Sequence, residues 1–190
     1  MKLFTTAFAA AFVLLAVPSV LAQRQMFTID PNASDVKMTL KTTHEIVNGT
    51  FHVDSGSIGY DRKSSSIFGT VVIAAGSGKT GNDSRDKKMN KDILKVQQYS
   101  NVIFNPKSYT GTIAPSGDST IQVAGVITLL GTPHGVTVLM HVHIDGAGCT
   151  AKTHFMIPYV QWGLKNPSFL IWKADNDVAI DLDLVGRLSS

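Results

Sequence analysis

The sequence holds a single cysteine, Cys149, among its 190 residues. One cysteine excludes an intrachain disulfide, so the fold must be held together by its hydrophobic core. Cys149 itself is expected to be a small buried side chain. Neither sign of charge is in large excess, since 17 Lys and Arg stand against 14 Asp and Glu. That balance excludes the strongly basic surface that is typical of nucleic-acid-binding proteins.

Sequence motifs of catalysis and nucleotide binding are missing as well. There is no G-x-S-x-G nucleophile elbow. The stretch GSGKT at 76–80 resembles a phosphate-binding loop, but Ile73 stands where that motif requires its first glycine. Three further residues then separate it from the next helix, whose first amides would have to hold the phosphate. We therefore interpret 74–86 as a connector into a helix capped by Asp83 or Ser84, and we expect no nucleotide.

The histidines give no clear metal site. His141 and His143 form an H-x-H pair whose side chains project from one face of a strand. Zinc or copper would need a third ligand, and none lies at a recognisable spacing. Asp181 and Asp183 also share a strand face, which is more simply explained as a solvated surface. The sequence therefore predicts no metal, no cofactor and no catalytic centre.

Two-residue alternation of apolar and polar side chains fills most of the chain and predicts half-buried strands. Turn residues at 53–56, 115–118, 131–133 and 145–148 separate these strands. The segment 84–98 instead spaces its apolar residues at helical intervals, which predicts one short amphipathic helix. The alternating faces expected to point inward are Val36, Met38 and Leu40; Ile121, Val123, Gly125, Ile127 and Leu129; Val136, Val138, Met140, Val142 and Ile144; and Val178, Ile180, Leu182 and Leu184.

Many strands with one helix, and no strand–helix repeat, predict an all-β fold. We expect an extended antiparallel barrel of about eight strands, lipocalin-like, with one short α-helix between strands. Residues 1–22 have a lysine, an apolar run and a final alanine, which predicts a signal peptide cleaved after Ala22. No cysteine follows that point to carry a lipid anchor. Residues 23–190 then form a single domain, which we expect in the periplasm.

An ordered set of stretches resembles the YceI-like family. They lie at 27–40, 44–61, 80–89, 99–111, 123–138 and 162–164. Matches to family positions are His44, Gly49 and Phe51 for its histidine and G-x-F, Arg85 and Asp86 for its RD pair, and Gly125, Leu129 and Gly131 for its G-x-L-T-L-x-G segment. The sequence departs from the family pattern at four positions. Ile127 stands where the family usually has a leucine, and Lys88 and Met89 stand where it often has a histidine and a leucine. Gln161 stands where it usually has an acidic residue.

The resemblance implies a secreted, lipocalin-like barrel that binds polyisoprenoid chains. An eight-stranded barrel is either filled by side chains or holds one small ligand, and the resemblance favours a ligand cavity. It implies a periplasmic carrier of a polyisoprenoid or similar long apolar lipid, with a quinone among the candidates. Arg85 and Asp86 would either hold the helix over the barrel opening or contact a headgroup. The expected lumen residues are Val36, Met38, Leu40, Phe51, Phe68, Ile93, Phe104, Val123, Ile127, Leu129, Val138, Met140, Val142, Phe155, Trp162, Ile180 and Leu182.

Two other functions stay open from the sequence. One is a metal-dependent or quinone-linked redox enzyme. The other is a partner-binding stress protein whose core is filled. The sequence also leaves open whether the barrel forms a homodimer.

Overall fold

The computed structural model describes residues 24–189, and the expected signal peptide lies outside them. Within that range the chain forms an antiparallel sheet with three short helical segments between its fifth and sixth strands. The helical segments are η1 (Ala75–Ser77), α1 (Asp83–Lys88) and the π-helical η2 (Met89–Ile93). The strands are β1 (Arg24–Ile29), β2 (Asp35–Lys41), β3 (Ile46–Phe51), β4 (Val53–Asp61), β5 (Ser66–Ala74), β6 (Asn101–Gly111), β7 (Gly117–Leu129), β8 (Thr132–Asp145), β9 (Gly148–Ile157) and β10 (Val178–Ser189).

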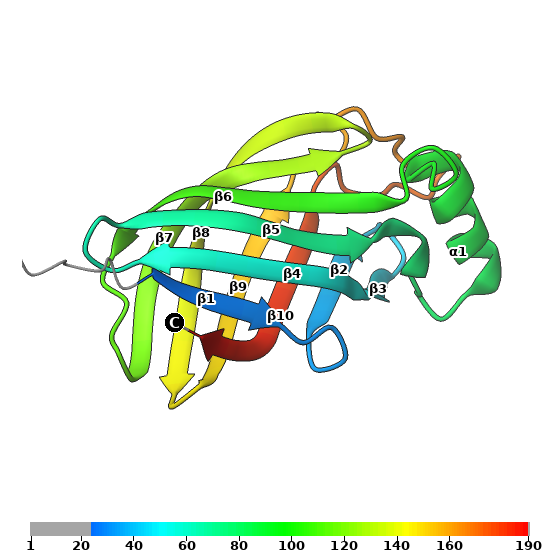
Figure 1. Cartoon of the computed structure of the whole chain (residues 1–190). Helices are drawn as coiled ribbons and strands as arrows, with labels where there is room; N and C mark the ends of the chain where they lie inside the picture. The colour runs from blue at the N-terminus through cyan, green and yellow to red at the C-terminus, as the bar shows by residue number, and fades with distance from the viewer. Residues whose placement is uncertain (1–23, 190) are drawn as a thin grey trace, which may run out of the picture.

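The sheet closes on itself. Eight strands follow one another in the order β1-β4-β5-β6-β7-β8-β9-β10, and β10 pairs back onto β1 to complete the barrel. The extra strands β2 and β3 extend it, because β2 lies on the same edge of β10 as β1 does, further along the strand. Figure 1 shows this arrangement, with α1 at one end of the barrel. The predicted all-β barrel with a single short α-helix is confirmed.

The alternating pattern accounts for which side chains face inward. In β7, Ile121, Val123, Gly125, Ile127 and Leu129 are buried, and the residues that alternate with them are more exposed. A side chain on an antiparallel strand points to the face opposite its neighbours, so one apolar residue in two is enough to line the interior. The two strands β7 and β8 meet in a tight turn at 130–131, where both residues have positive φ. This is the hairpin geometry that suits the twist of antiparallel strands.

The predicted turn at 53–56 is wrong, because these residues begin β4. The pairing of β4 with β5 shifts register between Val53 and Ser55, so a β-bulge absorbs the polar residues. Gly56 serves close packing and not a turn, since a Cβ there would lie 2.4 Å from Cδ1 of Ile29. Turn-forming residues within a strand and those between strands are the same in composition, so the sequence could not separate them.

The helix cap was also assigned wrongly. Asn82, and neither Asp83 nor Ser84, caps α1, with its Oδ1 accepting from the amide of Arg85 at 3.0 Å. The helix is short and its last turn widens into η2, where the amide of Leu94 donates to the carbonyl of Met89 at 2.8 Å. Among residues 24–189, none of the helices has the length and the apolar run that crossing a bilayer requires.

Candidate ligand-binding site

One half of the barrel interior is filled by side chains. It is the half away from α1, where Tyr60 and Tyr109 project inward and are almost fully buried. The hydroxyl of Tyr109 donates to the backbone carbonyl of Asp61 at 3.0 Å, and the guanidinium of Arg62 lies 5.5 Å from the ring of Tyr60. The core cluster of this half comprises Phe27, Ile29, Val36, Val53, Ile58, Tyr60, Val71, Tyr109, Ile113, Ile121, Val123, Val138, Met140, Ile144, Cys149, Ala151 and Leu184.

The other half, beneath α1 and η2, is hollow. A cavity of about 200 Å³, measured over the positions open to the centre of a water molecule, opens toward the helical end. One water occupies roughly 10–15 Å³ on that scale, so this volume is far larger than a packing defect. No polar atom contributes to the cavity surface.

Of the seventeen lumen residues expected from the sequence, thirteen line this cavity. They are Val36, Met38, Leu40, Phe51, Ile93, Phe104, Ile127, Leu129, Val138, Met140, Phe155, Ile180 and Leu182. The other four do not. Val123 and Val142 belong to the filled half, whereas Trp162 packs against the cluster around the cavity, with its ring stacked 4.3 Å from that of His134. Phe68 lies on the outer wall, 42% exposed, with Arg24 over its ring.

The structure adds eleven lining residues that the expected list left out: Ile73, Met89, Leu94, Val102, Val136, Thr153, Ile157, Tyr159, Leu164, Pro167 and Val178. Some carried a readable signal, because Val136 and Val178 lie on the alternating faces, and Met89 lies among the residues at helical spacing with Leu94 next to them. Leu164 and Pro167 come from the loop between β9 and β10, which has no periodicity to indicate its facing.

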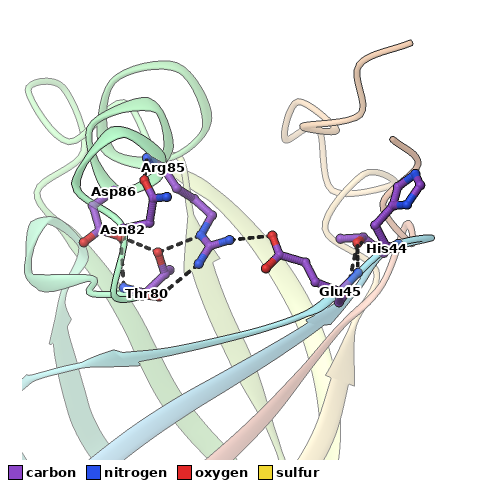
Figure 2. A network of polar contacts seen from close by, with 7 residues as sticks. His44, Glu45, Thr80, Asn82, Arg85 and Asp86 are labelled. Atoms are coloured by element: carbon purple, nitrogen blue, oxygen red, sulfur yellow. Dashed lines mark hydrogen bonds and ion pairs between the residues drawn. The ribbon is translucent and has the colours of Figure 1, made fainter. Parts of the chain in front are cut away.

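Arg85 and Asp86 hold α1 at the mouth of this cavity. The carboxylate of Asp86 accepts from both the amide and the hydroxyl of Thr80, at 2.9 and 2.6 Å. Arg85 donates to Thr80 and, across the opening, to Glu45 in the turn between β2 and β3 at 2.8 Å. Figure 2 shows this chain of contacts from the helix to the strand turn. The hydroxyl of Thr80, as the strongest influence, holds the pKa of Asp86 below its usual value, so this carboxyl is charged at neutral pH.

A second cavity adjoins the first at the mouth, and we call it the vestibule. It shares Met38, Leu40, Met89, Ile93 and Pro167 with the apolar cavity. Its remaining lining residues include Thr42, Glu45, Thr80, Arg85, Lys88, Ser168, Trp172 and Lys173, so polar and charged side chains stand there although most of the lining surface is apolar. A ligand in the hollow half would thus meet apolar walls inside and charged groups at the opening.

A family model for the YceI-like domain matches residues 27–186. The chain belongs to the YceI-like family. Solved structures similar to it include a polyisoprenoid binding domain from Saccharophagus degradans implicated in plant cell wall breakdown (17% identity, 86% of this chain and 98% of that one, TM-score 0.69). Another is Burkholderia cenocepacia BcnA (19% identity, 83% and 99% covered, TM-score 0.67). At these identities the likeness shows the fold. No curated protein matches the chain in sequence.

The family's motif residues now have structural explanations. The ring of His44 lies 4.1 Å from that of Trp172 at the mouth. Gly49 lets the connector approach β3, because a Cβ there would lie 3.2 Å from the carbonyl oxygen of Lys79. Gly125 makes room for Phe104, whose ring a Cβ would approach to 2.5 Å. These glycines serve close approach between neighbouring segments, and the RD pair serves the position of α1.

The GSGKT stretch is a connector in which the amides of Lys79 and Thr80 are already engaged. Lys79 and Thr50 exchange backbone hydrogen bonds at 2.9 and 3.0 Å, and the amide of Thr80 donates to Asp86. Gly78 lies against Met89 and Phe51, where a Cβ would come within 2.7 Å of either side chain. A phosphate cradle needs free amides that converge on one point, which this packed arrangement does not offer.

The histidine pair lies on the outer wall, as its register predicted. His141 and His143 are exposed, and their Nδ1 atoms contact Thr120 at 3.1 Å and Asp118 at 2.7 Å. Within residues 24–189 no group of three or more His, Cys, Asp or Glu side chains is placed to hold a metal ion. Cys149 is buried in the filled half, and burial raises the pKa of its thiol to about 11, so it is a poor nucleophile at neutral pH.

Proposed function

We propose that this protein binds one long apolar lipid of the polyisoprenoid class in the hollow half of its barrel and carries it through the periplasm. The observation that carries the proposal is the cavity itself, which is wholly apolar inside and adjoins a vestibule that carries charged side chains. Membership of the YceI-like family, which is a family of binding proteins and not a known enzyme family, supports it. A solved relative is described as a polyisoprenoid binding domain, and we extend that ligand class to this chain.

Apolar burial alone can drive such binding. Each methylene group removed from water contributes roughly 0.8 kcal/mol, so a five-carbon isoprene unit contributes about 3–4 kcal/mol. A few units outweigh the association cost of about 4–15 kcal/mol. The cavity needs no charged contact inside it, which agrees with walls that offer none. Any polar end of the lipid, such as a quinone ring, would lie at the vestibule, beside Arg85 and Lys88.

Location in the periplasm rests on the expected signal peptide at 1–22. N-terminal sequencing of protein recovered from the periplasmic fraction checks both the location and the cleavage after Ala22. Protein that keeps its first 22 residues in the cytoplasm would contradict this part of the proposal and leave lipid binding untouched.

Extraction of natively purified protein with organic solvent, followed by mass spectrometry, tests the ligand directly. We expect a stoichiometric polyprenyl lipid or prenylated quinone. Bound metal with catalytic turnover would favour the redox enzyme, and protein with neither ligand would favour the partner-binding module. The double variant His141→Ala/His143→Ala is the matched control for the metal alternative, because both rings lie outside the barrel and lipid content should not change.

The sequence left a homodimer open. Sedimentation velocity of the protein with and without lipid would test it.

A further inference from the structure

The loop between β9 and β10 presents four large apolar side chains to solvent. Phe169, Leu170, Ile171 and Trp172 are 66%, 73%, 73% and 51% exposed. We call residues 169–172 the apolar tip. Four consecutive exposed residues of this kind are unusual on a folded surface, where single apolar residues are common but contiguous ones mark an interaction site.

The apolar tip is held firmly by backbone pairing. Phe169 and Trp172 exchange two backbone hydrogen bonds of 2.9 Å, which closes a tight turn. The loop that follows is tied to the turn between β2 and β3, since the amide of Thr43 donates to the carbonyl of Lys173 at 2.8 Å. The ring of His44 packs on Trp172 from the same turn. The apolar side chains are thus displayed on a fixed support, beside the cavity mouth.

The turn also places a leucine where the fold would favour another residue. Leu170 has a φ of 51°, in the left-handed region that costs most side chains about 1 kcal/mol or more and that glycine or asparagine adopts easily. A strained, exposed leucine contributes little to folding. Strain of this kind, at an exposed position, is a reason to look for a function outside the fold.

Charge around the mouth is asymmetric. The mouth segments 41–45, 75–100 and 158–177 carry nine Lys and Arg against six Asp and Glu, whereas the other described residues carry seven against eight. Within residues 24–189, Arg85 is the only one of those nine with an ion-pair partner. The apolar tip therefore stands at the positive end of the molecule, with Lys165 and Lys173 close to it in the chain.

We propose that the apolar tip docks on the surface of an anionic phospholipid membrane. Its side chains enter the boundary between headgroups and acyl chains, and the mouth lysines attract the headgroups. Two features favour a membrane over a protein partner. The tip is a single turn with a tryptophan, the residue enriched at membrane–water interfaces, and lysines flank it. Trp172 and Lys173 also line the vestibule, so docking would bring the cavity mouth to the bilayer.

This inference goes beyond ligand binding and stands without it, because docking needs only the outer surface. Vesicles of phosphatidylethanolamine with about 30% phosphatidylglycerol, whose negative surface attracts basic segments, are the probe. We expect the protein to sediment with these vesicles and to bind pure phosphatidylcholine vesicles at least tenfold more weakly. The chain has two tryptophans, so Trp162→Phe leaves Trp172 as the single reporter. Its fluorescence should shift to the blue and be quenched by brominated lipid.

The matched variants separate docking from folding. Leu170→Asn with Ile171→Ser should reduce vesicle affinity at least tenfold and leave the thermal midpoint unchanged or higher, because asparagine tolerates the left-handed backbone. Leu139→Ser, on the outer wall and 53% exposed, is the control and should bind vesicles as the wild type does. Lys165→Gln with Lys173→Gln should lower affinity several-fold for the anionic vesicles only.

Three outcomes would overturn the inference. The first is that the protein does not bind vesicles, and the second is that the tip variant binds them as well as the wild type does. The third is that the protein binds no vesicles but self-associates, and that the tip variant abolishes the self-association. This third outcome would assign the tip to contact with a second copy of the chain. A failure of the lumen proposal would look different. A protein that docks on vesicles but yields no lipid on extraction would refute the carrier and support the docking surface.

Discussion

The two halves of the barrel share their strands and their alternating pattern but differ in what fills them. In the half away from α1, tyrosines and branched aliphatic side chains pack into one cluster across the interior. In the half beneath α1, the buried residues also contact one another in a second cluster, but they surround the cavity and do not fill it. Alternation along a strand therefore determines which side chains face inward, whereas their size and what closes the end determine whether the interior is full.

The two ends are also closed by different means. At the filled end, Arg62 donates to the carbonyl of Ile113 at 3.1 Å and covers Tyr60, so the closure is part of the core. At the hollow end, α1 is held across the opening by the polar contacts of Arg85 and Asp86. Polar contacts at a partly exposed site are weaker than packing, so the hollow end should open more readily than the filled one.

The largest expected effect comes from a charge placed between the two halves. Met140 lines the cavity and also belongs to the filled cluster, so it forms part of the cavity floor. Met140→Lys should abolish lipid recovery, because the ammonium must either lose its water or bring water into the cavity. Recovered lipid per folded protein, measured by mass spectrometry, is the readout.

Leu139→Lys is the matched control, one residue away and facing outward, and it should keep its lipid. If Met140→Lys retained lipid and Leu139→Lys lost it, the inward register of β8 would be wrong. If both retained it, the ligand would lie outside this cavity and the carrier proposal would fail.

Truncation of two isoleucines on β7 compares the halves directly. Ile121 lies in the filled half and Ile127 at the cavity, and they are 3% and 5% exposed. Ile121→Ala should lower the free energy of unfolding by about 2–5 kcal/mol, as deletion in a packed core does. Ile127→Ala should cost less, because one side of its side chain already borders empty space and loses fewer contacts. Chemical denaturation measures both, and equal costs would show that the cavity is filled in solution.

Much of the wall could be predicted because period-two alternation is a strong local signal. It predicted the inward faces of β2, β7, β8 and β10 correctly, and the helical spacing located the helical segments α1 and η2. The signal does not report depth along the strand. Val123 and Ile127 lie on the same face of β7, yet the first is in the filled half and the second at the cavity.

The rest of the site depends on contacts between distant segments. Phe68 reads as an inward aromatic, but in β5 it lies on the outer wall, where Gly59 of the paired strand leaves room for its ring. The Arg85–Glu45 pair joins residues forty positions apart, and no spacing in the sequence indicates it. The apolar tip lies in a loop without periodicity, so its exposure could be read only from the folded chain.

Acid should loosen the hollow end through Asp86. The pKa of Asp86 is lower in the folded protein than in the unfolded chain. The charged carboxylate therefore stabilises the fold at pH values above the pKa of the unfolded chain, about 3.9. This stabilisation is lost as the pH falls through the pKa of the folded protein. The amide resonance of Thr80 should titrate below pH 3.9. Asp86→Asn should remove that titration and speed amide exchange in α1 and η2 at pH 7.

Asp61 at the filled end provides the comparison. Its pKa is lowered chiefly by the backbone amide of Lys63, with that of Ser64 next. Asp86→Asn should leave exchange around Asp61 unchanged, because the two sites lie at opposite ends of the barrel. Faster exchange at both ends in the variant would show that the two halves unfold as one unit.

The smallest expected effect lies inside the cavity wall. The hydroxyl of Thr153 is buried and has no hydrogen-bond partner among the described residues. Thr153→Val replaces that hydroxyl with a methyl group and should raise the free energy of unfolding by about 1 kcal/mol, because an unpaired buried polar group is removed. Thr137→Val, on the exposed face of β8, is the control and should change little. Destabilisation by Thr153→Val would mean that the hydroxyl has a partner in solution, a water or a polar group of the ligand, and that the hollow half is less dry than its walls suggest.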